Sequence, residues 1–203
     1  MGYWAVPTLC GSLVRLEPLG QGHVADLVAA ACEDVGTFGY TLVPSDLEGM
    51  QRHVDALLDD DALGVVVAFA QVDTRSDRAV GMTRFLTVRQ RPGATTPYAV
   101  EIGGTWLAAS AQRTGINTEA KRLLMTYAFE TWGVTRVDLK TDSRNTRARE
   151  AIERLGARYE GVLRHWQPSM VSGEEDGYRD TAMYSVIDQE WPTVAERLDG
   201  LLL

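Results

Sequence analysis

The stretch Ser110–Leu124, SAQRTGINTEAKRLL, joins a predicted strand that ends near Ala109 to a predicted helix that begins near Asn117. The unpaired N–H groups and the positive dipole end of a helix N-terminus attract anions. Gly115 permits a positive φ or the close approach of a bulky anion, and Arg113 adds a positive charge. The stretch therefore indicates an anion-binding loop.

An ordinary capped helix is the alternative, because Asn117 and Thr118 are both suitable N-cap residues. The stretch has neither the Gly-x4-Gly-Lys-Ser/Thr pattern of a P-loop nor the three-glycine fingerprint of dinucleotide-binding folds. The choice between a loop for an anion and a simple cap therefore depends on the rest of the chain.

Hydrophobic periodicity and turn residues divide the chain into strands and helices. Three strands separated by TRSD and QRPGATTP predict an antiparallel meander before the loop, and the helix after the loop would cross over to a parallel strand. The order predicts an α/β (α+β) fold, with helices on both faces of a mixed central sheet of about seven strands, antiparallel in its first half. Strands are predicted at 12–19, 64–73, 78–89, 98–109, 136–142, 157–166 and 180–188, and helices at 23–34, 46–60, 117–132, 145–156 and about 189–202.

The composition is that of an ordinary globular protein of 203 residues, 45% hydrophobic and 24% charged, and we expect one domain over 1–203. A net charge of −8 argues against a nucleic-acid or anionic-membrane binder, so a bound anion needs a local site. Cys10 and Cys32 give neither a disulfide framework nor metal-ligand spacing. Without a signal-peptide pattern or an apolar stretch that could span a bilayer, we expect a cytoplasmic protein that holds no metal.

The segment Gln112–Asn117, QRTGIN, resembles the Q/R-x-x-G-x-G/A signature of the GNAT superfamily of acetyl-CoA-dependent N-acetyltransferases. Seven stretches resemble the RimJ/RimL-type branch of that superfamily and occur in its order: LVRLEPL, GMTRF, EIGGTWL, TGINTEAKRLL, VDLKTDSRNTRAREAIERLGA, EGVLR and RDTAMYSV. The resemblance covers a core of about 12–188. It implies the GNAT fold, in which two central strands splay apart, and acetyl-CoA or coenzyme A as the co-substrate.

The resemblance assigns roles to the loop and to its neighbours. The strand before the loop would pair its backbone with the pantetheine arm of coenzyme A, at Trp106, Leu107 and Ala108. Asn145 and Arg149 would complete the cofactor site, although Asn145 also suits the N-cap of its helix and Trp106 also suits the core. The loop itself would bind the pyrophosphate on backbone N–H groups, at Gln112, Arg113, Thr114, Gly115, Ile116, Asn117 and Thr118.

By this resemblance, the acetyl group would pass from acetyl-CoA directly to a primary amine in a ternary complex. Glu101 is our candidate base because it lies on the strand that would line the splay, on the same side as Gly103 and Thr105. The alternative for Glu101 is an ion pair with Arg84 on the preceding strand. His165 is a second candidate base, since imidazole titrates near neutral pH.

The usual proton donors for the leaving thiolate are missing. The RimJ/RimL-type pattern has a serine three residues after its asparagine, where this chain has Ala148, and AREAIERLG lacks the tyrosine found in the wider superfamily. The thiolate would then take its proton from water. Two alternatives stay open: a larger acyl donor such as succinyl-CoA, with Arg84 as the basic substrate contact, and a catalytically weak acyl-CoA-binding regulatory protein.

The acceptor amine is the least determined part. In this fold the helix–loop–helix, here about 22–60, shapes the acceptor pocket, and it offers Phe38 and Tyr40. A protein or peptide N-terminus and a small amine suit it equally. Trp4, Trp191 and the apolar end LLL could dock on the domain or on a second copy, so a homodimer is open, whereas no nucleic-acid or membrane partner is expected.

Overall fold

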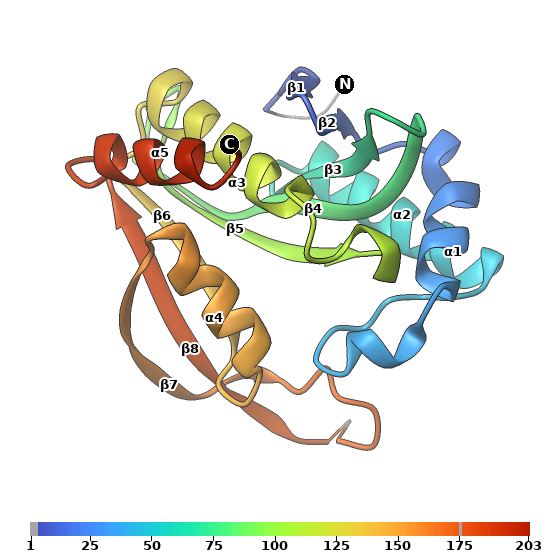
Figure 1. Cartoon of the computed structure of the whole chain (residues 1–203). Helices are drawn as coiled ribbons and strands as arrows, with labels where there is room; N and C mark the ends of the chain where they lie inside the picture. Colours follow the sequence, from blue (N-terminus) through green and yellow to red (C-terminus); the bar gives the residue numbers. More distant parts are fainter. Residues whose placement is uncertain (1–3, 175) are drawn as a thin grey trace.

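The predicted meander forms the centre of one sheet in a computed structural model that describes residues 4–174 and 176–203 (Figure 1). Its strands are β3 (Val66–Asp73), β4 (Arg78–Gln90) and β5 (Pro97–Leu107). Every residue of β3 is buried, because both faces of the sheet are covered there. The meander is confirmed, and its strand ends lie within about two residues of the predicted ones.

The described residues form an eight-stranded sheet in the order β1-β2-β3-β4-β5-β6-β8-β7. All neighbours are antiparallel except β5 and β6, which run parallel because the chain crosses over between them through α3. The strand beyond the expected seven is β1, which has only two residues. The remaining bounds are Leu9–Cys10 for β1, Val14–Pro18 for β2, Arg136–Asp142 for β6, Arg158–Pro168 for β7 and Tyr178–Ile187 for β8.

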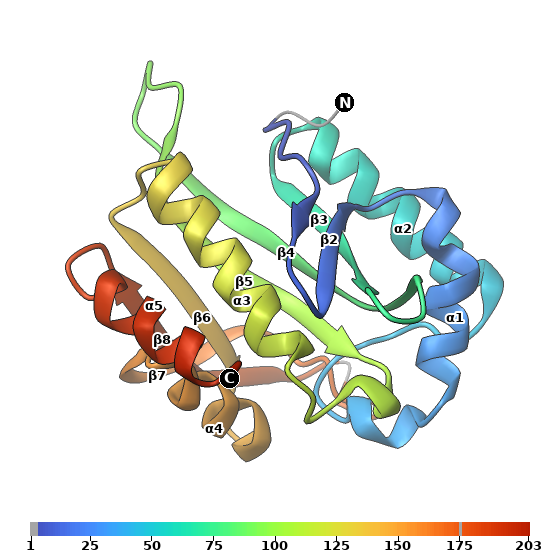
Figure 2. The same cartoon turned by 45° about the horizontal axis from the view of Figure 1, so that its top comes forward.

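Helices cover both faces of the sheet, as predicted (Figure 2). The helices α1 and α2 pack on β4 and β3, whereas α3, α4 and α5 lie on the opposite face. Within the described ranges, no helix has the length and apolar character that a membrane crossing requires. The α-helices are α1 (Val24–Cys32), α2 (Leu47–Ala62), α3 (Ile116–Thr126), α4 (Thr146–Leu155) and α5 (Trp191–Gly200). Three 3-10 turns are η1 (Gln21–His23), η2 (Val35–Phe38) and η3 (Ala109–Ala111). A π-helical turn, η4, follows α3 at Tyr127–Thr131.

Both tryptophans near the chain ends pack on the chain itself. Trp4 donates from Nε1 to the carbonyl oxygen of Gly64 at 2.9 Å, and its ring meets Trp132 edge-on. Trp191 is buried and stacks on Phe129, with ring centroids 5.2 Å apart. The sequence allowed these tryptophans to pack either on their own domain or on a second copy. In the structure they pack on their own domain, and a homodimer stays a prediction.

A buried carboxylate fastens β2 to α3. Glu119 accepts hydrogen bonds from the backbone N–H groups of Ser12 (2.9 Å), Leu13 (2.7 Å) and Val14 (2.8 Å) and from the Ser12 hydroxyl (2.7 Å). Gly11 leaves the necessary room, because a Cβ there would lie 2.3 Å from Oε2 of Glu119. Burial would raise the pKa of Glu119, but these donors outweigh it and hold the pKa below its usual value.

We predict that Glu119→Ala lowers the free energy of unfolding at pH 7 by about 3 kcal/mol, because buried N–H groups lose their acceptor. The difference from wild type, measured by urea denaturation, should shrink in acid, since the contribution of a carboxylate with a lowered pKa is lost as the pH falls through that pKa. Glu48→Ala is the control, because Glu48 is exposed and pairs with Arg52 on the surface of α2. Equal losses in the two variants would contradict the prediction.

Candidate functional site

The strands β5 and β6 pair over three residues and then part (Figure 1). Ala99–Glu101 pair with Arg136–Asp138, after which β5 follows β4 to Leu107 and β6 follows β8 to Asp142. Beyond the paired residues, the edges that β5 and β6 turn toward each other have no strand partner in the described part of the chain. Such an edge can pair with an extended ligand as an added strand does. The predicted splay is confirmed.

The loop after β5 presents unpaired backbone N–H groups. No acceptor among the described residues lies within hydrogen-bond distance of the amides of Arg113, Thr114, Gly115, Asn117 and Thr118. Arg113 adopts a left-handed backbone conformation with φ of 58°, which turns the chain into α3. Consecutive free amides at a helix N-terminus are suited to phosphate oxygens.

Gly115 does not adopt the positive φ that the sequence allowed, whereas the close approach of an anion to it stays a prediction. Its φ is −69°, and a Cβ there would lie 2.4 Å from Cδ1 of Leu13. The glycine is therefore needed for close packing against Leu13, while the positive φ belongs to Arg113. The expected caps are also wrong: Gly115 is the N-cap of α3, and neither Asn117 nor Thr118 makes a side-chain capping bond. The Oδ1 atom of Asn117 is buried and lacks a partner in the described structure.

Gln112 ties this loop to both sides of the splay. Its amide nitrogen donates to the carbonyl oxygen of Leu107 at 2.9 Å and to the hydroxyl of Thr37 at 3.2 Å. Its Oε1 accepts from Arg147 of α4 at 3.1 Å, and Arg147 also donates to the carbonyl oxygen of Thr37. Arg147 was not among the predicted site residues, although its place in the first turn after Asn145 indicates such a position.

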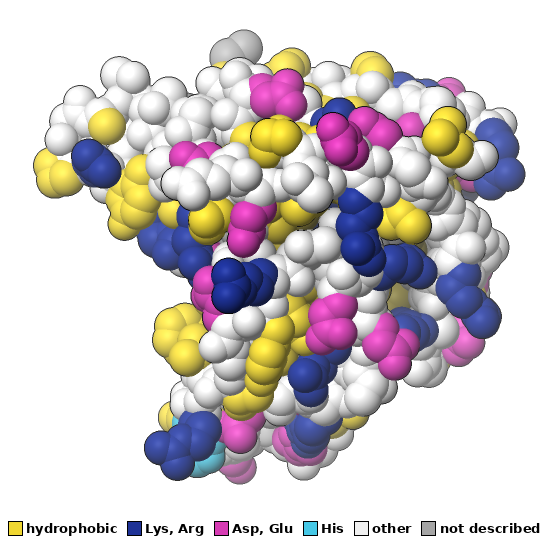
Figure 3. Space-filling view, turned by 60° about the vertical axis from the view of Figure 1, so that its left-hand side comes forward, with side chains coloured by type: hydrophobic (Ala, Val, Ile, Leu, Met, Phe, Trp, Pro, Cys, Tyr) yellow, Lys and Arg dark blue, Asp and Glu magenta, His cyan; other side chains and the backbone are white. Residues whose placement is uncertain are grey.

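Positive charge near the loop is local. On the face shown in Figure 3, basic side chains are interspersed with acidic and hydrophobic ones. The whole chain carries a net charge of −8. An anion at the loop would therefore depend on backbone amides and on individual arginines such as Arg113 and Arg147, rather than on a general basic field.

Asn145 and Arg149 both have partners within the chain. Asn145 caps α4, accepting from the N–H of Ala148 at 3.0 Å. Arg149 donates from Nε to the hydroxyl of Tyr184 at 3.0 Å and lies over the ring of Tyr159. The cap that the sequence allowed for Asn145 is present, whereas the proposed cofactor contacts of both residues stay predictions.

Glu101 lies in an ion pair, but not with the expected partner. Its side chain is 4% exposed, and Oε2 lies 2.9 Å from Nζ of Lys140 on β6 and 3.0 Å from the hydroxyl of Thr87. No carboxylate of the described residues lies within 4 Å of the Arg84 guanidinium. The partner comes from across the splay because Glu101 and Asp138 are paired in register, which places Lys140 one step further along the same face.

A β-bulge in β5 separates two sets of side chains. Met82 pairs with Trp106 and Arg84 with Gly103, so β5 has one residue more than β4 in this interval. Gly104 has φ of 57°. The extra residue sends Thr105 to the α3 face, which corrects the expectation that it shares a side with Glu101.

Lys121 of α3 is held under this bulge. Its Nζ donates to the hydroxyls of Thr105 at 2.6 Å and Thr83 at 3.1 Å, and the side chain is buried. Burial lowers the pKa of Lys121 to about 7. This contact is not predictable from the sequence, because it exists only once the bulge has turned Thr105 toward α3.

The predicted acceptor side chains flank the end of β5. Phe38 of η2 packs edge-on against Trp106, with ring centroids 5.6 Å apart. Tyr40 lies under the guanidinium of Arg144 at 5.6 Å. Trp106, Leu107 and Ala108 are all buried. The loop at 35–40 and the end of β5 are therefore brought together, as the helix–loop–helix prediction requires.

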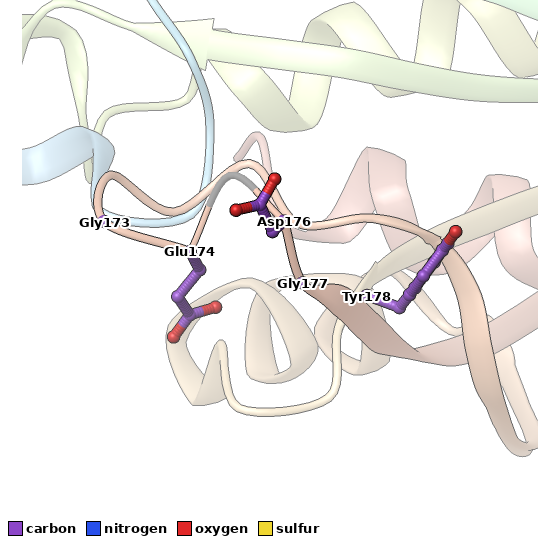
Figure 4. Close-up of a pocket in the computed structure, with 5 residues that line it drawn as sticks. All are labelled: Gly173, Glu174, Asp176, Gly177 and Tyr178. Carbon is purple, nitrogen blue, oxygen red and sulfur yellow. The ribbon is translucent and has the colours of Figure 1, made fainter.

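His165 lies apart from the splay. It is on β7, with β8 between it and β6, and its backbone N–H donates to Asp180. One shallow hollow lies beside it, at Arg164 and Asp180. A second lies in the loop before β8, where the carboxylates of Glu174 and Asp176 point in different directions (Figure 4). Neither hollow is lined by β5 or α3, and the described residues bring no three His, Cys, Asp or Glu side chains together as a metal site.

A sheet that parts at its parallel pair, beside a loop of free amides that opens a helix, is the architecture of an acyl-CoA-dependent acetyltransferase. Residues 14–158, more than half of the chain, match the acetyltransferase (GNAT) domain. The chain therefore belongs to the GNAT acetyltransferase family, as its sequence predicted.

Relatives agree with this assignment. A GCN5-related N-acetyltransferase from Brucella melitensis is 29% identical, with a TM-score of 0.82 over 97% of this chain and 85% of that one. Mycobacterium smegmatis RimJ, solved in complex with CoA-disulfide, shares the fold at 20% identity, with a TM-score of 0.75 over 96% of this chain and 91% of that one. YdaF of Bacillus subtilis strain 168, named as a candidate ribosomal N-acetyltransferase, is 35% identical over 88 residues, 43% of this chain and 45% of that protein, so the match spans less than half of that relative. These similarities agree with the RimJ/RimL-type branch.

We predict a pH dependence of stability that is specific to Lys121. Between its folded-state pKa of about 7 and its ordinary value of 10.5, the unfolded chain binds more protons than the folded one. Stability should therefore rise with pH across this window relative to Lys121→Met, which fills a similar volume without titrating. The difference in unfolding free energy between the two proteins should change by roughly 3 kcal/mol from pH 7 to 10 in urea titrations. Parallel pH curves would contradict it.

Proposed function

We propose that this protein is an N-acetyltransferase that moves the acetyl group of acetyl-CoA directly to a primary amine in a ternary complex. The observation that carries the proposal is the juxtaposition of the free edges of β5 and β6 with the free amides before α3. The amides would hold the pyrophosphate and the β5 edge would pair with the pantetheine arm, so the thioester would lie in the splay. Free, exposed Cys10 and Cys32 suit the cytoplasmic setting that the proposal includes.

The proposed reaction needs no covalent enzyme intermediate. The amine nitrogen attacks the thioester carbon, negative charge builds on the carbonyl oxygen, and the C–S bond breaks as the oxyanion collapses. A backbone N–H of β5 beside the bulge would stabilise that oxygen. The ammonium form of the acceptor must first lose a proton, for which Glu101 is the proposed base, and the nitrogen loses its second proton to water as the amide forms. Because Ala148 offers no hydroxyl, the thiolate would take its proton from water.

The acceptor would enter from the α1–α2 side of the sheet. Phe38 and Trp106 supply an aromatic wall there, and Tyr40 lies beside Arg144. Such a wall suits a short extended peptide end or a small amine. The name of YdaF favours a ribosomal acceptor, and a small amine is the other acceptor class to be tested.

Removing the charge of Arg113 should weaken coenzyme A binding about tenfold without unfolding the loop. Arg113→Asn is the sharpest variant, because asparagine tolerates the left-handed conformation that Arg113 adopts. Calorimetric titration with coenzyme A measures the affinity, and thermal melting reports the fold. Arg91→Asn, in the exposed turn between β4 and β5, serves as the control. Unchanged affinity in Arg113→Asn would count against the proposed pyrophosphate site.

The base role of Glu101 can be separated from its ion pair. Glu101→Gln should lower kcat at least 100-fold, but it also leaves Lys140 without its partner. The double variant Glu101→Gln/Lys140→Met restores neutrality and should recover thermal stability without recovering kcat. Acetyl-CoA with a panel of peptides and small amines, followed by thiol release, provides the measurement. Recovery of kcat together with stability would assign Glu101 a purely structural role.

A further inference from the structure

Five charged residues form a band across four strands on the α1–α2 face of the sheet, beside Asp138, which pairs with Arg89 and Arg136. They are Arg84 of β4, Glu101 of β5, Lys140 and Asp142 of β6, and Arg179 of β8. Strand register places them on one face: Arg84 pairs with Gly103, Glu101 with Asp138, and Asp142 with Thr181. The band crosses the point at which β5 and β6 part.

The two carboxylates of the band are already neutralised. Glu101 pairs with Lys140 at 2.9 Å. Asp142 pairs with Arg144 at 2.8 Å. In the described chain, neither Arg84 nor Arg179 has a carboxylate within 4 Å. The band therefore carries two guanidinium groups without counter-charges in contact.

The Arg179 side chain is buried, and that of Arg84 is half-buried. Arg179 is 7% exposed, and the hydrogen bond of its guanidinium goes to the hydroxyl of Thr181 at 3.1 Å. Nε of Arg84 is buried and has no partner within the described residues. Burial lowers the pKa of both arginines despite the attraction of Glu101. Buried charges of this kind are unfavourable until an anion pairs with them.

The unpaired arginines lie where a substrate would react. The guanidinium of Arg84 lies over the bulge of β5, since a Cβ on Gly104 would be 2.3 Å from its Nε. Its other titratable neighbours come from α2: Asp60 attracts it, and burial and Arg84 together lower the pKa of His53. Arg179 lies on β8, two residues before Thr181, which pairs with Asp142 at the end of β6. Arg179 is therefore just beyond the end of β6. An anion bound at either arginine would therefore border the splay on its acceptor side.

We propose that Arg84 and Arg179 form a carboxylate-binding subsite, so that the substrate of this enzyme carries a carboxylate close to the reacting group. The inference rests on the proposed function and narrows its substrate class. Guanidinium groups pair with carboxylates through two parallel hydrogen bonds, which gives both affinity and orientation. The carboxylate has two sources: the acyl group of a dicarboxylic acyl-CoA, or an acidic group beside the acceptor amine.

Two matched pairs of substrates distinguish these sources. Succinyl-CoA and acetyl-CoA differ in a carboxylate on the donor, and peptides beginning Ser-Asp and Ser-Asn differ in one on the acceptor. Calorimetric binding of the two donors without acceptor, and KM for the two peptides with acetyl-CoA, are the readouts. In one of the two pairs, we expect the wild-type protein to have at least a tenfold lower Kd or KM for the member that carries the carboxylate. Arg84→Gln and Arg179→Gln should each reduce that preference to about twofold or less.

Arg52→Gln is the matched control, because Arg52 lies exposed on α2 and should leave the preference unchanged. Melting temperatures of the variants without substrate separate binding from folding: loss of an unpaired buried charge should leave them equal to wild type or higher. Absence of preference in both pairs would overturn the inference, as would a preference that survives both arginine variants. A donor preference without turnover on any amine would contradict the proposed function alone, whereas turnover without a preference would contradict only the subsite.

Discussion

The structure depends on the place where β5 and β6 stop pairing. Three residues on each strand form the parallel ladder of the sheet, and beyond them each strand keeps only its outer neighbour, β4 or β8. Backbone groups on the inner edges must then find water or a ligand, because buried amide groups do not remain unpaired without cost. The same divergence exposes the end of β5 to the loop that opens α3. In the proposed function, the end of this pairing would position both the strand edge that binds the cofactor and the carbon that reacts.

The bulge in β5 gives the two faces of this strand different chemistry. It turns Thr105 toward α3, where Lys121 donates to it. Before the bulge, Glu101 and Gly103 face α2, and the guanidinium of Arg84 lies over Gly104. A regular strand would have placed Thr105 among the charged side chains. The bulge therefore places Thr105 beside Lys121 on one face and the ion pair of Glu101 on the other.

The parts of this fold that depend on local sequence were predictable. Periodicity and turn residues located the meander and the crossover helix, and the glycine loop was placed correctly because strand end, loop and helix are adjacent in the chain. Contacts set by strand register were not predictable. Lys140 replaced Arg84 as the partner of Glu101, and Arg147 joined Gln112, because each pair is brought together only by folding. The reason for Gly115 was also hidden, since Leu13, against which it packs, lies about a hundred residues earlier.

A protein with a net negative charge can still bind an anion if a few positive groups lie in a partly buried site. With a net charge of −8, this chain would repel a distant anion, and salt would screen even that field beyond about 8 Å. Inside the fold the balance is different, because lower polarity strengthens each local interaction. The free amides before α3 and the Arg84 guanidinium beside the bulge both act at contact range. Selection among anions would therefore depend on shape and hydrogen-bond geometry within the splay, not on the charge of the surface.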